Sequence, residues 1–262
     1  MITANGVSLR LDTGGAGARL LFLNGTGGTI EQIAPLVGLF RSRFEVAVFD
    51  QRGLGESGSP PGVWTMADYA ADALAVADHL RWSTFSVIGL SFGGMVAQEL
   101  VVTWPGRVNA LVLACTSPGG ALASYPLHEL EDLDASARAA HMTLLMDTRF
   151  TQDWLAGHPG DAGLMSAINN RQRPSDPARL DGMLRQLQAR AGHDVLDRLH
   201  LITCPTLVAA GRYDGIAPLA NSEAIAARIP GARLAVFEGG HAFFGQDRTA
   251  IPTIMEFCAT HA

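Results

Sequence analysis

Short apolar runs alternate along the chain with longer stretches in which apolar residues recur every three to four positions. The runs contain few polar positions, as is typical of strands that are covered on both faces of a sheet. The recurring pattern is typical of helices with one apolar face. The predicted strands are Val7–Leu11, Arg19–Leu23, Glu45–Phe49, Phe85–Ile88, Ala110–Ala114, Thr206–Ala210 and Arg233–Phe237. The predicted helices are Ala67–Leu80, Gly93–Thr103, Leu219–Arg228 and Ile251–Thr260.

This alternation predicts an α/β fold with a mostly parallel, doubly wound sheet. One stretch, residues 118–199, breaks the pattern because its apolar residues recur only at helical spacing. We interpret it as a helical lid that is inserted before the last two strands and lies over the carboxyl ends of the sheet. The core is then expected to comprise residues 1–117 and 200–262.

Composition narrows the function classes. The chain has 262 residues, 48% of them hydrophobic and 17% charged, with a net charge of −6, which argues against a nucleic-acid partner. Every one of the 19 basic residues is Arg, so lysine-dependent phosphate binding and Schiff-base chemistry are excluded. Neither a signal peptide nor an apolar run of about 20 residues is evident, so we expect a cytoplasmic protein without membrane contact.

The sequence predicts neither a metal nor a cofactor. Its three cysteines are scattered singly, which supports neither a disulfide framework nor a zinc site. The run Gly53–Gly58 fits the dinucleotide pattern G-x-G-x-x-G, but Ser59-Pro60-Pro61 follows where a helix would have to begin.

The strongest chemical motif is Gly89-Leu90-Ser91-Phe92-Gly93, a G-x-S-x-G between a predicted strand and a predicted helix. A strand-to-helix turn this sharp strains the backbone of Ser91 and exposes its hydroxyl at the carboxyl end of the sheet. Glycines two residues before and after the serine remove the side chains that would collide there. The motif therefore predicts a nucleophilic serine.

A serine nucleophile needs a base, and the base needs an orienting carboxylate. His241 follows the last predicted strand and Asp214 follows the strand before it, so both are expected at the same sheet edge as Ser91. The chain order Ser, Asp, His is that of the G-x-S-x-G hydrolases. For the tetrahedral oxyanion, we expect the backbone N–H groups of Phe92 and Thr26 to act as donors.

These motifs resemble the α/β-hydrolase superfamily over about residues 19–117 and 200–262. The resemblance rests on the loop Asn24–Gly28, the run Asp50–Ser57, the turn Gly89–Gly93 and the loops of Asp214 and His241. Within the superfamily, the sequence is similar to 3-oxoadipate enol-lactone hydrolases. Asn24 stands at a position where many members have His. The loop Asn24–Gly28 differs from the usual sequence of that group. The resemblance implies a cofactor-free serine hydrolase whose partner is a small ester or lactone.

Other activities on the same fold remain open, namely carbon–carbon bond hydrolysis of ring-cleavage products, cofactor-free perhydrolysis and ligand reception with little turnover.

Several residues are candidates for substrate binding. Asn24 lies in the oxyanion loop, and Arg171 and Arg173 form part of a polar cluster suited to a substrate carboxylate. The aromatic and apolar candidates for an acyl pocket are Trp64, Phe92, Met95, Trp154 and Phe243.

Overall fold

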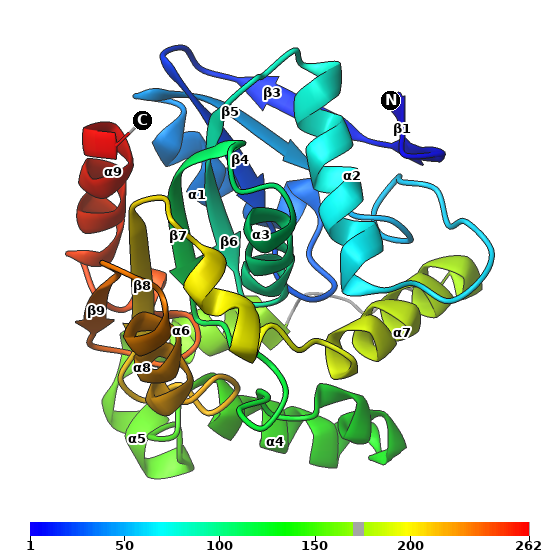
Figure 1. The fold of residues 1–262 in the computed structure, drawn as a ribbon. Coiled ribbons are helices and arrows are strands. Elements are labelled where there is room, and N and C mark those ends of the chain that lie inside the picture. Colours follow the sequence, from blue (N-terminus) through cyan, green and yellow to red (C-terminus); the bar gives the residue numbers. More distant parts are fainter. Residues whose placement is uncertain (170–175, 262) are drawn as a thin grey trace.

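A seven-stranded sheet forms the centre of the computed structural model, which describes residues 1–169 and 176–261. The strand order is β3-β5-β4-β6-β7-β8-β9, and every neighbouring pair is parallel except β3 with β5 (Figure 1). A separate two-stranded ribbon pairs β1 with β2. The strands are β1 (Ile2–Ala4), β2 (Val7–Leu9), β3 (Leu11–Gly14), β4 (Ala18–Leu23), β5 (Phe44–Phe49), β6 (Phe85–Leu90), β7 (Val108–Ala114), β8 (Thr206–Gly211) and β9 (Arg233–Phe237).

Alternate side chains of the central strands enter two separate apolar layers. In β4, Leu21 and Leu23 pack with one cluster, whereas Leu20 and Phe22 pack with the other. All four side chains are at most 1% exposed. Burial on both faces explains why these strands are continuous apolar runs. It confirms the mostly parallel, doubly wound α/β sheet that the sequence predicts.

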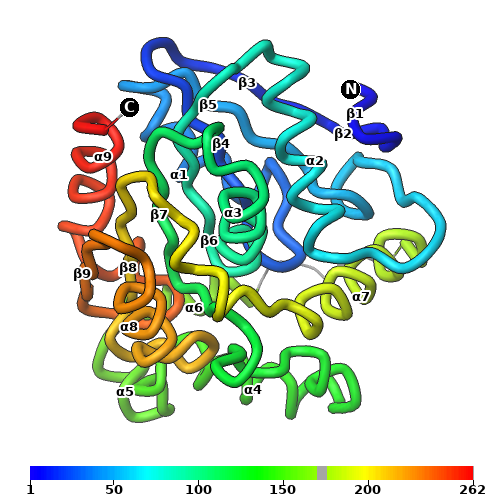
Figure 2. Tube along the Cα trace, in the orientation of Figure 1, coloured from blue at the N-terminus to red at the C-terminus, as the bar shows by residue number. Residues whose placement is uncertain are grey.

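Helices cover both faces of the sheet (Figures 1 and 2). Helices α2, α3 and α8 contribute to the layer that contains Leu21, and α1 and α9 contribute to the layer that contains Leu20. Their bounds are α1 (Ile30–Phe40), α2 (Met66–His79), α3 (Phe92–Thr103), α8 (Leu219–Arg228) and α9 (Ala250–His261).

Between β7 and β8 the described chain contains helices joined by irregular segments, with isolated bridges at Gly119 but no strand (Figure 2). Its elements are the 3-10 helices η1 (Leu127–Asp132) and η2 (Leu196–Leu201) and the α-helices α4 (Ala135–Met146), α5 (Gln152–Gly157), α6 (Pro159–Asn169) and α7 (Pro177–Ala191). We call residues 118–199 the insertion. Among the residues that the structure describes, none of the helices is long and apolar enough to cross a membrane.

Two local predictions need correction. The predicted strand Val7–Leu11 is divided at Arg10 between β2 and β3, which belong to different sheets. Helix α1 was not predicted, because Pro35 and Gly38 interrupt its pattern. The helix nevertheless has a start signal, since the Gln32 side chain accepts a hydrogen bond from the Thr29 N–H in the manner of a capping box.

A buried histidine gives a prediction about the stability of the protein in acid. His193 follows the end of α7 and is 3% exposed. Burial lowers the pKa of His193 to about 4, from an ordinary value near 6.5. Between pH 6.5 and pH 4 the unfolded chain is protonated at this histidine and the folded protein is not. The free energy of unfolding should therefore decrease as the pH is lowered, by up to about 1.4 kcal/mol per pH unit. Above pH 6.5 the contribution is flat.

Urea unfolding from pH 7.5 to pH 4.5 tests this effect. His193→Gln should lose this part of the pH slope, whereas His200→Gln, which replaces an exposed histidine, should keep it. Equal slopes for wild type and His193→Gln would contradict the assignment.

Candidate active site

The backbone at Ser91 has the strained geometry that the motif predicts. Ser91 lies between β6 and α3 with φ 50° and ψ −112°, a conformation that L-residues rarely adopt. A Cβ at Gly93 would lie 2.1 Å from the Leu23 carbonyl oxygen, and one at Gly89 would lie 2.5 Å from the Gly93 oxygen. Only glycines allow α3 to approach the strands this closely, and this approach places Ser91 at the sheet edge.

Ser91, His241 and Asp214 lie within hydrogen-bonding distance in a continuous line. The His241 Nε2 atom lies 3.0 Å from the Ser91 Oγ, and its Nδ1 atom lies 2.7 Å from the Asp214 Oδ2. With the Nδ1–H donating to the carboxylate, Nε2 is left to accept the proton of the serine hydroxyl. The side chains of His241 and Asp214 are 12% and 1% exposed, so this chain of contacts is largely shielded from water.

The second oxygen of Asp214 is also fixed. Its Oδ1 atom accepts hydrogen bonds from the N–H groups of Ile216 and Ala217, both at 2.8 Å. These two bonds leave Oδ2 aimed at the imidazole. Nearby, burial raises the pKa of the Cys115 thiol well above its usual value, with a further contribution from the Asp214 charge, so this cysteine stays protonated at neutral pH.

The loop after β4 forms a tight turn beside the serine. The Gly28 N–H donates to the Gly25 carbonyl at 3.1 Å, and Gly27 has φ 69°, as a type II turn requires at its third position. A Cβ at Gly25 would lie 3.5 Å from the Cβ of Ser91. Within the described chain, the N–H groups of Thr26 and Phe92 donate to no backbone carbonyl in the turns, loops and helix ends. Both are therefore available to a ligand oxygen.

The insertion is hydrogen-bonded to the loops that carry Asp214 and His241. The His241 N–H donates to the Met146 carbonyl at 2.6 Å, and the Gly215 N–H donates to the Leu145 carbonyl at 3.0 Å. The Thr148 N–H donates in turn to the Tyr213 carbonyl at 2.9 Å. One short segment of the insertion therefore holds both loops.

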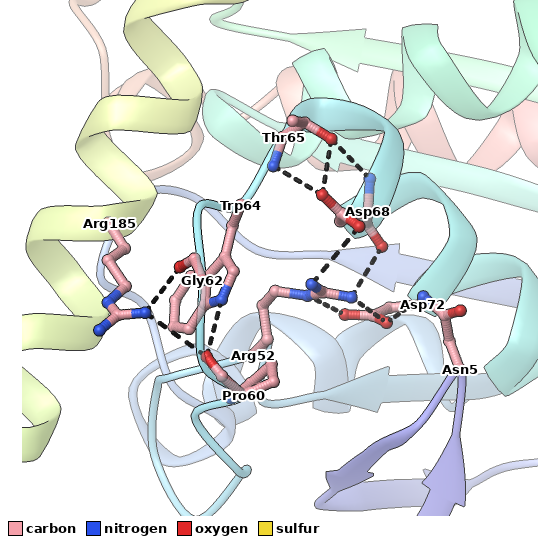
Figure 3. A network of polar contacts seen from close by, with 9 residues as sticks. All are labelled: Asn5, Arg52, Pro60, Gly62, Trp64, Thr65, Asp68, Asp72 and Arg185. Atoms are coloured by element: carbon pink, nitrogen blue, oxygen red, sulfur yellow. Dashed lines mark hydrogen bonds and ion pairs between the residues drawn. The ribbon is translucent and has the colours of Figure 1, made fainter.

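A second attachment joins α7 to the loop that leads to Trp64 (Figure 3). The Arg52 guanidinium forms two 2.7 Å hydrogen bonds to the buried Asp72 carboxylate, which also accepts one from Asn5. This pair fixes the start of the loop that leads to Trp64. Arg185 of α7 donates to the Gly62 carbonyl of the same loop at 2.7 Å, so α7 is attached to the core here.

The predicted substrate-binding residues occupy different environments. Asn24 uses its side chain within its own loop, accepting from the Gly25 N–H and donating to the Thr29 carbonyl. Trp64 is 3% exposed and donates to the Pro60 carbonyl. A binding role for either residue stays a prediction.

The remaining candidates are dispersed. Phe243 is fully buried between Phe237 and Phe244, and Met95 belongs to the core layer of α3. Trp154 lies inside the insertion, where it stacks on His158 and donates to Asp161. Arg171 and Arg173 lie outside the described residues.

Sequence reasoning missed two polar residues of α7, Gln186 and Arg190, which are 0% and 6% exposed. Gln186 accepts a hydrogen bond from the Gly27 N–H at 2.7 Å. Arg190 donates to the Ser124 hydroxyl and the Tyr125 carbonyl, and burial lowers its pKa to about 10. A signal was present, because both polar residues fall on the face of α7 that carries Leu187 and Met183 toward the core.

A parallel α/β sheet with a strained serine turn and a histidine between serine and aspartate defines the class of α/β-fold hydrolases. The family described as alpha/beta hydrolase fold matches residues 18–247. The chain belongs to this family.

Individual relatives agree with this assignment. The chain is 31% identical over 242 residues to poly(3-hydroxyalkanoate) depolymerase of Ectopseudomonas oleovorans, covering 91% of this chain and 83% of the relative. It is 27% identical to 3-oxoadipate enol-lactonase 2 of Acinetobacter baylyi, covering 92% and 88%. The crystal structure of the enol-lactonase from Burkholderia xenovorans LB400 superposes with a TM-score of 0.81 at 21% identity, covering 98% of this chain and 99% of that chain. The resemblance to enol-lactonases is thus confirmed.

The close approach at Gly93 gives a prediction about folding. Gly93→Ala should destabilise the protein by about 3 kcal/mol or more, because the new methyl group would meet the backbone of Leu23 and Asn24. Gly163→Ala is the matched control, since it adds a methyl group in open space on α6 and should stabilise by about 0.5–1 kcal/mol. Chemical denaturation measures both, and a Gly93→Ala protein as stable as wild type would show that the turn tolerates a side chain.

Proposed function

We propose that the protein is a serine hydrolase that cleaves a small carboxylic ester or lactone through an acyl-enzyme. The single observation that carries the proposal is the unbroken line of contacts from Ser91 through His241 to Asp214 at a strained turn. A serine hydroxyl with a base at 3.0 Å and an oriented carboxylate behind that base is the arrangement that activates it.

In the first half of the reaction, the Ser91 Oγ attacks the acyl carbon while His241 Nε2 accepts its proton. Asp214 stabilises the imidazolium that forms. The carbonyl oxygen becomes an oxyanion and receives hydrogen bonds from the N–H groups of Thr26 and Phe92. The oxyanion then collapses, the bond to the leaving oxygen breaks, and His241 returns the proton to that oxygen.

In the second half, a water molecule takes the place of the leaving alcohol. His241 removes its proton as it attacks the acyl carbon, and the same donors hold the second oxyanion. Collapse breaks the bond to Ser91, which regains its proton from His241, and a carboxylic acid is released. With a lactone, the acid and the alcohol leave as one molecule.

The substrate class is supported by the chemistry that the relatives' names share. A lactone and a poly(3-hydroxyalkanoate) both contain an acyl carbon bonded to oxygen, and the named relatives act on one or the other. The same site chemistry accepts either substrate, so we assign the class of small esters and lactones.

Replacement of the nucleophile tests the proposal. Ser91→Ala should reduce hydrolysis of a short p-nitrophenyl ester by about 10⁴-fold or more, because the covalent step is lost. It should also abolish labelling by a fluorophosphonate. The control is Ser86→Ala, which removes a buried hydroxyl from the same strand and should leave turnover unchanged.

Two outcomes would contradict the mechanism. A folded Ser91→Ala protein that kept more than about a tenth of the wild-type rate would exclude Ser91 as the nucleophile. Labelling of the wild type without any turnover of esters or lactones would instead favour a ligand receptor on the same fold.

Replacement of the orienting carboxylate gives a separate prediction. Asp214→Asn should lower kcat by about 10³–10⁴-fold, since the amide no longer holds the imidazole with Nδ1 protonated. Asp153→Asn, which removes an exposed carboxylate from α5, controls for the change in charge. A nearly unaffected Asp214→Asn protein would mean that another carboxylate orients His241.

A further inference from the structure

A side chain of α7 forms a hydrogen bond to the turn that offers the Thr26 N–H. The Gln186 Oε1 atom accepts a hydrogen bond from the Gly27 N–H at 2.7 Å across 159 positions of sequence. Gly27 also faces α7 directly, because a Cβ there would lie 3.9 Å from the Met183 side chain.

The peptide that Gln186 contacts is the one that determines the type of turn. In a turn closed between Gly25 and Gly28, the central peptide joins Thr26 to Gly27 and can flip between two orientations. A hydrogen bond to the Gly27 N–H favours the orientation that the structure shows, with Gly27 at φ 69°. The Thr26 N–H lies on the neighbouring peptide, so the bond from Gly27 fixes the backbone one residue away from the proposed oxyanion donor.

Helix α7 is well suited to act as a rigid support. On one side, Arg185 donates to the Gly62 carbonyl and packs over Trp64 (Figure 3). On the other side, Arg190 donates to Ser124 and Tyr125. A Cβ at Gly182 would lie 2.1 Å from the Gly53 carbonyl oxygen, so helix and core are in backbone contact.

Folding alone does not account for an amide at this position. Gln186 is completely buried, and its Nε2 atom has no hydrogen-bond partner within the described chain. A buried donor without an acceptor destabilises a protein. An apolar residue of similar size would remove that donor but leave the Gly27 N–H without its acceptor, so the two effects on folding oppose each other. What the amide supplies is an acceptor for the turn Gly25–Gly28, which we call the oxyanion turn.

We infer that Gln186 is a positioning residue that holds the oxyanion turn in its productive conformation, so that the insertion takes part in transition-state stabilisation. This inference rests on the proposed function, because it assumes that the Thr26 N–H binds the oxyanion. A positioning residue of this kind acts on the charged transition state and much less on the bound ester.

The test compares Gln186→Met with Gln188→Met, which replaces an exposed glutamine on the same helix. For Gln186→Met, kcat on p-nitrophenyl butyrate should fall by about tenfold or more, with KM changed by no more than about threefold. The inhibition constant of a trifluoromethyl ketone with the same acyl chain should rise by the same factor, because its adduct with serine carries an oxyanion. Gln188→Met should match wild type in all three measurements.

Thermal unfolding separates this role from a merely structural one. Gln186→Met should unfold close to the wild-type temperature, because it removes a buried, unpaired donor and also leaves the Gly27 N–H without its acceptor. Should that variant not fold, Gln186→Asn takes its place, since its shorter side chain cannot reach Gly27 and the same kinetic pattern is expected. Two unfolded variants would make Gln186 a structural residue and would overturn the inference.

Other outcomes separate this inference from the function on which it rests. An unchanged kcat for Gln186→Met, or a loss confined to KM, would overturn the role of Gln186 while wild-type turnover and its loss in Ser91→Ala left the hydrolase standing. If the wild type neither turned over the ester nor bound the ketone, both proposals would fall together.

Discussion

The strained backbone of Ser91 is the constraint on which the site depends. A residue at φ 50° and ψ −112° is destabilised by about 1–3 kcal/mol relative to relaxed backbone. Four hydrogen bonds oppose this strain, because the Ser91 N–H donates to Ala114 while its carbonyl accepts from Gly94, Met95 and the Thr116 hydroxyl. At about 0.5–1.5 kcal/mol each, they are sufficient to offset it. The turn is therefore held by β7 and α3, and the serine is placed before any ligand arrives.

The other groups of the site lie on loops that are hydrogen-bonded to the insertion. Asp214 and His241 follow β8 and β9, and their loops are bonded to the backbone of residues 145–148. The oxyanion turn follows β4 and is bonded to α7. Each of these three loops therefore begins at a strand of the sheet and is bonded to the insertion. This arrangement accounts for two buried polar groups of the insertion, since Asp147 accepts a hydrogen bond from Gln246 and Gln186 accepts one from Gly27.

The elements that periodicity describes were predictable from the sequence. Strand Arg233–Phe237 and helix Leu219–Arg228 have the bounds that the pattern predicts, and the other predicted strands that follow Val7–Leu11 agree to within two residues at each end. Failures occurred where local chemistry overrides the pattern. A proline inside α1 hid a helix whose capping box was visible, and the change of sheet at Arg10 has no periodic signature.

The same division applies to the candidate site. The proximity of Ser91, Asp214 and His241 was predictable because parallel strands bring their carboxyl ends to one edge, so order along the chain implies proximity in space. Nothing comparable places α7 against the loop after β4. The contact between Gln186 and Gly27 depends on how the insertion folds back over the sheet, and neither residue type indicates the other.

The position of the insertion bears on how substrates are distinguished in this fold. A lid that only covered the site would change the affinity for substrates and leave the chemistry alone. Here residues 145–148 of the insertion hold the loops of Asp214 and His241, and Gln186 holds the turn after β4. On the proposed function, a change in these parts of the insertion is therefore expected to alter the geometry of the reacting groups. Such a change should affect kcat as well as binding.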